Sequence, residues 1–245
     1  MIYNSFFIKS CLYQHTFNNP LIIFLFIKSI AFNLYSFANV IEVCLTNNIT
    51  NIVDIYTIGI YSSQNMLPWN EIEYVFPSNY YNLSKFLIEK QSEFFISKGL
   101  KIKTLRLAQV IGLGEREGYA LQVYLNNAIK GLPIKVMDNS IGKRQYVYVK
   151  DVVNAIIAAL ENQNLSGIFN IGMCKNYSFD ELANVINKTF GGKSEIIYDK
   201  TAKSDDNIYM MDITKAKNEL NWSPKYDLVD AYNDIKELIE GSSII

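Results

Sequence analysis

The chain has 245 residues, of which 49% are hydrophobic and 19% are charged, and its formal net charge is −1. This length allows one large or two modest domains with a sizeable core. A charge so close to zero gives no reason to expect nucleic acid or a membrane as a partner. The single histidine, His15, disfavours a Ser-His-Asp hydrolase, a Cys-His protease and a histidine-rich zinc site. Three widely spaced cysteines suit neither a metal cluster nor a disulfide framework, which favours a cytoplasmic location.

Residues 1–32 differ in composition from the rest of the chain. The stretch from Pro20 to Ile27 is apolar throughout, and Lys28 ends it. The run is shorter than the roughly 18 residues that a membrane-spanning helix needs, and no clear cleavage site follows it. We therefore expect a buried strand or helix here, or a segment unrelated to the fold of the rest, in preference to an anchor or a leader.

From residue 33 onward, strand and helix patterns alternate. The Gly-rich stretch 112–118 indicates a loop and a domain boundary. Alternation of this kind is typical of a parallel α/β sheet with helices on both faces. Helices are predicted at 33–47, 80–98, 118–130, 150–161, 178–190 and 228–240, and strands at 51–57, 102–107, 134–137, 145–149, 167–171 and 194–198.

The most informative local pattern places Tyr81 and Lys85 four residues apart, on one face of the helix predicted at 80–98. A cation beside a phenol lowers the phenol pKa, which is about 10 when unperturbed. Such a phenol can accept the proton of an alcohol that is being oxidised. The alternative is an ordinary amphipathic surface helix, because both residue types are common in this chain.

Thr57 ends the strand predicted at 51–57, just upstream of that helix. Parallel sheets place their ligands at the carboxyl ends of their strands. A hydroxyl at this point could hydrogen-bond the same substrate oxygen that Tyr81 deprotonates. The alternative is a threonine present only for its strand propensity.

From about Asn33 to the end, the sequence resembles the extended short-chain dehydrogenases/reductases, in particular the NAD-dependent epimerase/dehydratase group that acts on nucleotide sugars. Six motifs in the family's order make chance similarity a poor explanation. The matching segments are Thr57–Tyr61, Tyr81–Lys85 with Pro77 before it and Glu89 after it, Leu105–Gly114, Arg144–Val152, Phe169–Gly172 and Asp212–Pro224.

The resemblance implies an incomplete Rossmann-like, doubly wound parallel sheet over residues 33–113. It implies a smaller C-terminal α/β substrate-binding region over 114–245, with segments that return to the sheet. Residues 1–32 then form an atypical hydrophobic segment. NAD is the expected cofactor, with NADP not excluded, and a nucleotide sugar is the expected substrate. The resemblance is also compatible with a homodimer.

The resemblance also implies a role for each matching site residue. Tyr81 would move the hydroxyl proton, Lys85 would lower the Tyr81 pKa and hold the nicotinamide ribose, and Thr57 would orient the sugar oxygen. Three further positions take binding roles, Ala108 toward the cofactor and Gln109 and Arg144 toward the substrate. A guanidinium grips phosphate oxygens in a bidentate manner, which suits Arg144 to a diphosphate. The alternative for Arg144 is a solvated surface ion pair.

Two kinds of departure from the family pattern narrow the chemistry. Gln145 stands where an aspartate is usual, and Gln109 stands where an asparagine is common. Family dehydratases carry Asp-Glu directly after the catalytic threonine, whereas this chain has Ile58 and Gly59, neither of which can move a proton. The sequence therefore favours a 4-epimerase or a keto-sugar reductase over a 4,6-dehydratase.

The largest departure concerns the glycine-rich turn that holds the cofactor pyrophosphate in this family. The sequence before Thr57 contains no such pattern. A competing hypothesis is therefore a truncated, non-catalytic remnant that binds a sugar nucleotide without turnover. In that case the sheet would have an exposed edge that favours pairing with another chain.

Overall fold

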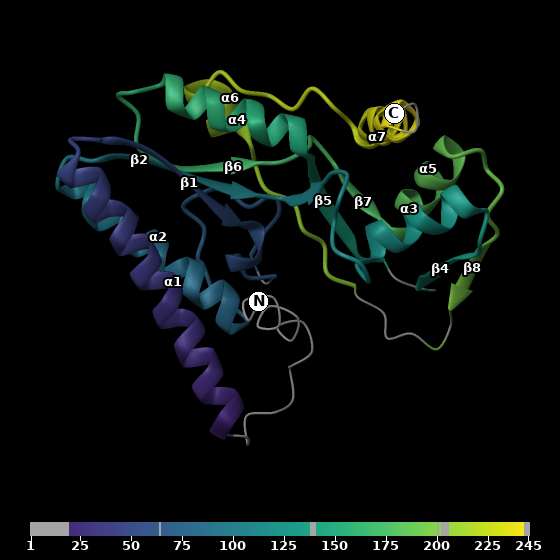
Figure 1. Ribbon diagram of the computed structural model, residues 1–245, viewed down its shortest axis with the longest axis horizontal. Coiled ribbons are helices and arrows are strands. Elements are labelled where there is room, and N and C mark those ends of the chain that lie inside the picture. Colours follow the sequence, from purple (N-terminus) through teal and green to yellow (C-terminus); the bar gives the residue numbers. More distant parts are fainter. Residues whose placement is uncertain (1–19, 64, 138–140, 200, 202–205, 243–245) are drawn as a thin grey trace.

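The computed structural model describes residues 20–63, 65–137, 141–199, 201 and 206–242 (Figure 1). Its elements, in chain order, are α1 (Pro20–Thr46), β1 (Asn51–Thr57), the 3₁₀ helix η2 (Ile58–Ile60), α2 (Tyr80–Ser97), β2 (Lys101–Leu107), β3 (Gln109–Ile111), α3 (Ala120–Lys130), β4 (Ile134–Met137), β5 (Lys143–Tyr148), α4 (Val149–Glu161), β6 (Gly167–Ile171), β7 (Asn176–Ser178), α5 (Phe179–Thr189), β8 (Ile196–Asp199), α6 (Thr214–Glu219) and α7 (Leu228–Ser242).

A parallel sheet of order β1-β2-β6 forms the centre of the first half. Figure 1 shows α1 and α2 on one face of this sheet and α4 and α6 on the other. The central strand β2 is buried at every position after Lys101, because helices cover both of its faces. The predicted α/β fold class with a parallel, doubly covered sheet is thereby confirmed. The two domain boundaries drawn from the sequence remain a prediction.

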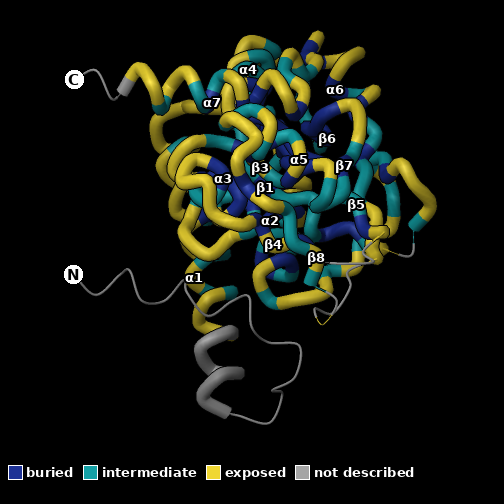
Figure 2. Tube along the Cα trace, turned by 90° about the vertical axis from the view of Figure 1, so that its right-hand side faces the viewer, coloured by how far each residue is buried: buried dark blue, intermediate teal, exposed yellow. Residues whose placement is uncertain are grey.

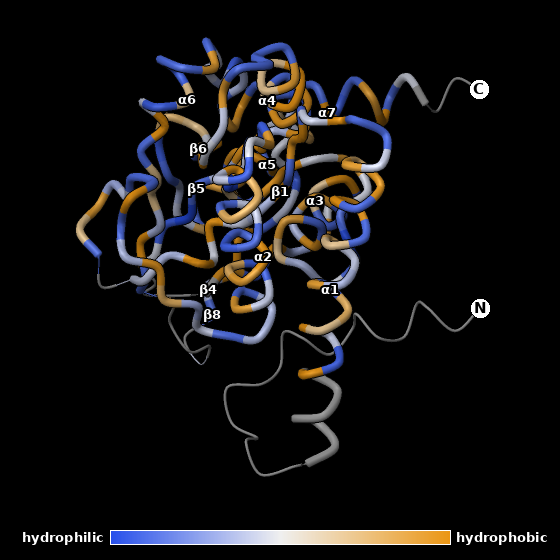
Figure 3. The backbone as a smooth tube through the Cα atoms, turned by 90° about the vertical axis from the view of Figure 1, so that its left-hand side faces the viewer, coloured by the Kyte–Doolittle hydropathy of each residue, from blue (hydrophilic) through white to orange (hydrophobic). Residues whose placement is uncertain are grey.

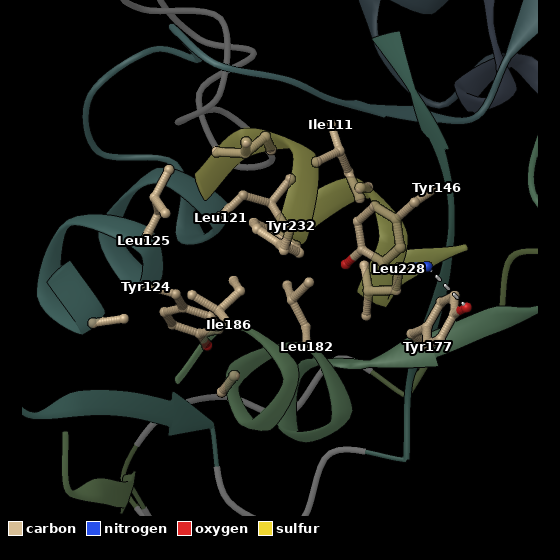
Figure 4. Close-up of a cluster of buried hydrophobic side chains, with 14 of the residues drawn as sticks. Ile111, Leu121, Tyr124, Leu125, Tyr146, Tyr177, Leu182, Ile186, Leu228 and Tyr232 are labelled. Carbon is tan, nitrogen blue, oxygen red and sulfur yellow. Dashed lines mark hydrogen bonds between the residues drawn. The ribbon is translucent and has the colours of Figure 1, made fainter. Parts of the chain in front are cut away.

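The second half contains two smaller sheets, β3-β5-β7 and β4-β8. Parallel pairing was expected throughout, but β7 runs antiparallel to β5. β7 and α6 were not predicted, since three and six residues are too short to show a period. A cluster of buried side chains from α3, α5, α7 and the neighbouring strands forms the core of this half (Figure 4).

One polar atom in that cluster lacks a partner among the described residues. The Tyr146 hydroxyl is fully buried and makes no hydrogen bond there, and burial raises the pKa of this phenol. An unpaired buried polar group costs about 1–3 kcal/mol. We therefore expect Tyr146→Phe to leave the free energy of unfolding unchanged or to increase it, as measured by urea denaturation.

Tyr177 supplies the matched control, because its hydroxyl accepts a hydrogen bond of 3.4 Å from the Leu228 N–H (Figure 4). Tyr177→Phe removes a hydrogen bond that is present, so it should lower stability by about 1 kcal/mol. A loss of stability in Tyr146→Phe as large as that in Tyr177→Phe would contradict the assignment of an unpaired hydroxyl.

The helix predicted to begin at residue 33 begins at Pro20. Proline is well suited to the first turn of a helix, because its missing N–H has no intrahelical partner there. The later part of α1 is fixed by Phe37 and Ile41, which are buried against Tyr56, Ile88 and Ile102. The described side chains of α1 from Ile27 onward are mostly exposed or half-buried (Figure 2). The apolar run from Pro20 to Ile27 is thus helical, and residues 1–19 lie outside the described part.

The outer strands of the β1-β2-β6 sheet, β1 and β6, differ in how their edges are closed. On β6, the Glu71 carboxylate accepts the Asn170 N–H at 2.9 Å, and the Lys215 ammonium donates to the Ile168 carbonyl at 2.9 Å. On β1, both backbone groups of Ile55 are bonded by side chains, the N–H by Asp54 and the carbonyl by Lys85. Charged side chains of this kind oppose the addition of a further strand.

Candidate functional site

Thr57 lies at the carboxyl end of β1, where the chain turns into η2. Its hydroxyl oxygen accepts the Gly59 N–H at 3.1 Å and so caps the 3₁₀ turn. The hydroxyl hydrogen remains available to donate, because accepting one bond uses only a lone pair. Thr57 is half-buried and ends a strand of the main sheet, as its sequence position predicts.

The first turn of α2 packs directly against η2. A Cβ atom on Gly59 would lie 2.7 Å from the Asn82 side-chain oxygen, which is closer than real side chains approach. Asn82 is buried beside Tyr81, and its own N–H is capped by Asn79 at 2.9 Å. Glycine at position 59 therefore lets the helix that carries Tyr81 meet the strand end that carries Thr57. Sequence reasoning missed Asn82, although an isolated glycine after a strand is a sign of close approach.

Lys85 lies one turn further along α2 and reaches the edge of β1. Its ammonium donates to the Ile55 carbonyl at 3.4 Å and lies 5.3 Å from the centre of the Tyr56 ring. The Asp54 carboxylate is close enough to feel the same charge, which offsets part of the rise in the Asp54 pKa caused by burial. Lys85 is thus held two residues before Thr57 on the same strand.

The Tyr81 side chain is 47% exposed, at the start of α2. Partial burial raises the pKa of this phenol, and the positive charge that lowers it is that of Arg116, in the loop before α3. The Tyr-x-x-x-Lys spacing predicts a lowered pKa and assigns the effect to Lys85. In the structure the pKa of Tyr81 is raised instead, because the effect of partial burial exceeds that of the Arg116 charge. The Lys85 ammonium lies against the Ile55 carbonyl and the Tyr56 ring.

Arg116 gives this electrostatic assignment a direct test. Arg116→Gln removes the charge that favours the Tyr81 phenolate, so the pKa of Tyr81 should rise further. Titration by NMR of protein labelled in its tyrosine rings measures this pKa, and the Tyr81→Phe spectrum assigns the signal. Lys85→Gln is the matched variant; if it raised the Tyr81 pKa more than Arg116→Gln does, the assignment to Arg116 would be wrong.

Ala108 and Gln109 lie where the chain passes from β2 to β3. Ala108 is buried, and its N–H donates to the Ile171 carbonyl at 2.9 Å, which extends the pairing of β2 with β6. Gln109 is half-buried, begins β3 and is in register with Tyr146 of β5. Both residues therefore follow the carboxyl end of β2, next to the strand that ends in Thr57.

Arg144 lies on β5, opposite Tyr177 of β7. Its guanidinium donates to the Asn207 carbonyl at 2.6 Å and stacks over the Tyr209 ring at 4.2 Å. These contacts hold the side chain flat against the segment that precedes α6. These contacts are to a carbonyl and to rings, and the surface ion pair given as the alternative for Arg144 stays a prediction.

Gln145, the departure from the usual aspartate, is a buried link between three segments. Its amide N–H donates to the Met173 carbonyl at 2.8 Å and its amide oxygen accepts the Met211 N–H at 2.9 Å. A carboxylate could accept from Met211 but could not donate to Met173. Gly172 completes the fit, because a Cβ atom there would lie 2.7 Å from the Gln145 side chain.

A buried ion pair connects α2, the helix that carries Tyr81, to β2, the strand that pairs with the one ending in Thr57. Arg106 of β2 makes two hydrogen bonds to Glu89 of α2, at 2.6 and 3.0 Å, and both side chains are about 2% exposed or less. Arg106 also donates to the Tyr61 hydroxyl at 2.6 Å, directly after η2. The Tyr61 hydroxyl donates in turn to Asn170 of β6 at 2.8 Å.

This network was not predicted from the sequence, which marked Glu89 and Tyr61 only as motif positions. A usable signal was present in β2, where Arg106 stands in an otherwise buried strand and so requires a buried acidic partner. The network ties η2, α2, β2 and β6 into one unit. It therefore acts as a positioning framework for the residues at the end of β1.

Comparisons with known proteins identify the family and the fold of the chain. Residues 28–172, more than half of the chain, match the NAD dependent epimerase/dehydratase family, beginning a little before the expected Asn33. The dTDP-4-dehydro-6-deoxyglucose reductase of Escherichia coli is 29% identical over 69% of this chain and 54% of its own length. A putative UDP-glucose 4-epimerase of Methanocaldococcus jannaschii is 29% identical over 80% of this chain and 65% of its own length. The chain thus spans between half and two thirds of these relatives.

Solved structures show the same fold. The UDP-N-acetylglucosamine 4-epimerase of Bacillus cereus superposes with a TM-score of 0.79 and 33% identity, over 92% of this chain and 75% of that one. The UDP-glucose 4-epimerase of Thermotoga maritima gives a TM-score of 0.79 and 26% identity, over 89% and 72%. The match across the Tyr81 helix and the β1, β2 and β6 strands is a match of sequence and of fold, and the chain belongs to the NAD-dependent epimerase/dehydratase family.

Proposed function

We propose that the chain acts on a nucleotide sugar as an NAD(P)-dependent 4-epimerase or keto-sugar reductase. The observation that carries the proposal is the close packing of Gly59 against Asn82, which sets the start of α2 on the end of β1. Thr57, Tyr81 and Lys85 then belong to one small region at the carboxyl edge of the sheet, where α/β proteins bind their ligands.

The described residues fit the nicotinamide end of the cofactor better than they fit its pyrophosphate. Lys85 can donate further hydrogen bonds, since its one described bond is long and an ammonium has three hydrogens. It would hold the nicotinamide ribose, and Ala108 would line the nicotinamide. Residues 20–63 contain a single glycine, Gly59, so this part of the described chain offers no glycine-rich turn for the pyrophosphate.

The proposed chemistry divides between the cofactor and the chain. The nicotinamide, when bound, accepts and returns the hydride. Thr57 donates its hydroxyl hydrogen to the sugar oxygen and orients it. Tyr81, after losing its own proton against its raised pKa, accepts the hydroxyl proton as the alcohol is oxidised. Ile58 and Gly59 offer no further proton donor or acceptor, so elimination of water is not part of the proposal.

Arg144 is the proposed contact for the diphosphate of the substrate. Its guanidinium stacks on Tyr209, and the planar shape of this group suits it to phosphate oxygens. Gln109, at the start of β3, would contact the sugar. Support comes from the structure of the Thermotoga maritima relative, which was solved with UDP-glucose.

Calorimetric titration with NAD, NADH and UDP-glucose tests the proposal. We expect both ligand classes to bind, with Lys85→Met weakening NAD and Arg144→Met weakening UDP-glucose. Binding of UDP-glucose with no binding of cofactor at millimolar concentration would support the second candidate, a sugar-nucleotide binder without turnover. That candidate is favoured by one observation, the single glycine in residues 20–63.

The homodimer and the cytoplasmic location stay predictions. Sedimentation would measure the oligomeric state, and cell fractionation would measure the location.

A further inference from the structure

A cavity of about 290 Å³ lies at the outer edge of β6, and residues of α2, β2, β6 and α6 line it. This volume is near the lower end of the range for pockets that hold small molecules. Figure 3 shows α6, a mostly hydrophilic helix, beside β6. Three polar residues of the lining, Glu71, Thr104 and Lys215, define what we call the β6 cavity.

Thr104 contributes a buried hydroxyl to the β6 cavity. It lies in the central strand β2 and is 1% exposed. Thr104 and Arg106 are two positions apart, so their side chains point to the same face of the sheet. Arg106 is bonded to Glu89 there, whereas no hydrogen bond to the Thr104 hydroxyl occurs within the described chain. Buried hydroxyls are normally paired, so a hydroxyl of this kind that lines a cavity points to a ligand that would pair it.

Two opposite charges line the same cavity, and the backbone of β6 holds each of them in place. The Glu71 carboxylate accepts the Asn170 N–H at 2.9 Å. The Lys215 ammonium donates to the Ile168 carbonyl at 2.9 Å and lies 4.6 Å from the centre of the Phe169 ring. Neither bond uses the whole capacity of its group, because a carboxylate has a second oxygen and an ammonium has further hydrogens. Burial also raises the pKa of the Glu71 carboxyl, and a cation bound beside it would offset this rise.

The rest of the lining is aliphatic or already paired. Both oxygens of the Glu93 carboxylate accept from the Lys90 ammonium, at 2.7 and 2.9 Å, so this third charge has its partner. Ile72, Ile96 and Ile168 supply hydrocarbon surface. Ile72 is 93% exposed, and a hydrocarbon group in the cavity would remove part of its surface from water.

We propose that the β6 cavity binds a free aliphatic α-amino acid. Its carboxylate lies against Lys215, its ammonium lies against Glu71, and its side chain lies among the isoleucines. Thr104 pairs its hydroxyl with one of the two charged groups of the ligand. A simple amine would meet the like charge of Lys215, and a simple acid would meet the like charge of Glu71. The inference is independent of the proposed function, since it uses no residue assigned to the cofactor or the nucleotide sugar.

Calorimetric titration of the full chain with L-leucine tests the proposal. Leucinamide keeps the ammonium without the carboxylate, and isocaproate keeps the carboxylate without the ammonium. Both retain the branched side chain. We expect leucine to bind at least about tenfold more tightly than either compound, because only leucine makes both charged contacts.

Lys215→Met removes the proposed partner of the carboxylate and should weaken leucine by about tenfold or more. Lys217→Met is the matched control on the same helix, because Lys217 is exposed and its ammonium lies 3.9 Å from the Cys174 sulfur, outside the lining. This control should bind leucine like the original chain. Thr104→Val keeps the shape of the side chain and should weaken leucine severalfold, with no loss of stability, because the hydroxyl has no bond within the described chain to lose.

Failure of leucine to bind at tens of millimolar would overturn the proposal. Equal affinities for leucine and leucinamide would do the same, since Lys215 would then have no role. Undiminished affinity in Lys215→Met or in Thr104→Val would place the amino acid elsewhere on the chain. If circular dichroism shows Lys215→Met to be unfolded, Thr104→Val decides alone. Titrations with NAD and UDP-glucose on the same samples keep the outcome for the proposed function separate.

Discussion

Arg106→Met is expected to lower the free energy of unfolding by about 3–5 kcal/mol. Arg106 and Glu89 form a bidentate ion pair with both side chains buried. Removal of the guanidinium leaves the Glu89 carboxylate buried without its partner, and it also removes a donor from the Tyr61 hydroxyl. An unpaired buried charge is the most expensive defect a single substitution can create here. Urea denaturation followed by circular dichroism measures the loss.

The double variant Arg106→Met/Glu89→Met separates charge from packing. It removes both charges together, so much of the lost stability should return. The surface pair Lys90–Glu93 on the same helix is the matched control, because both of its side chains are nearly half exposed. Lys90→Met should change stability by less than about 1 kcal/mol. A loss in Arg106→Met no larger than in Lys90→Met would contradict the argument.

Tyr81→Phe is expected to reduce the turnover of a nucleotide sugar by about 100- to 10,000-fold. The phenol oxygen is the proposed proton acceptor, and phenylalanine keeps the ring while it removes that oxygen. Affinity for UDP-glucose should be retained, because Arg144 and Gln109, the proposed contacts, are untouched. Measurement of epimerised or reduced product over time, with calorimetry on the same samples, separates turnover from binding.

Tyr74→Phe is the matched control for this prediction. Tyr74 is largely exposed, its ring lies beside Phe76, and it has no role in the proposed chemistry. Its turnover should equal that of the original chain. Unchanged turnover in Tyr81→Phe would refute the proton-transfer role, whereas an original chain that binds UDP-glucose without turnover would point to the second candidate function.

The elements with a clear period were predictable from sequence. The β-branched run 51–57 forms β1, and the helical pattern at 80–98 forms α2. The short elements β7 and α6 were not predictable from the sequence. β7 is fixed by its pairing with β5, and α6 is fixed by its packing near β6. The start of α1 was misplaced because an apolar run of eight residues shows no helical period.

Site features that depend on a residue's place in its own strand or helix were predictable from the sequence. Features that depend on contacts with residues far away in the chain were much less predictable. Thr57 ends a strand and Tyr81 begins a helix, and both facts are local. The charge near Tyr81 comes instead from Arg116, 35 positions away. Gln145 was similarly marked only as a departure from the usual aspartate, and its contacts with Met173 and Met211 show it to be a structural link. Spacing along the chain contains no information on such contacts.

The position of β1 at the outside of its sheet has a consequence for cooperativity. Within the described chain β1 pairs with β2 alone, whereas β2 has a strand on either side. The hydrogen bonds of an outer strand open at lower free energy than those of a central one. Backbone amides of β1 should therefore exchange with solvent sooner than those of β2. Since β1 ends in Thr57, local opening of this strand also disrupts the geometry of the site. A molecule that binds β1 and reduces this opening would therefore stabilise the site as well.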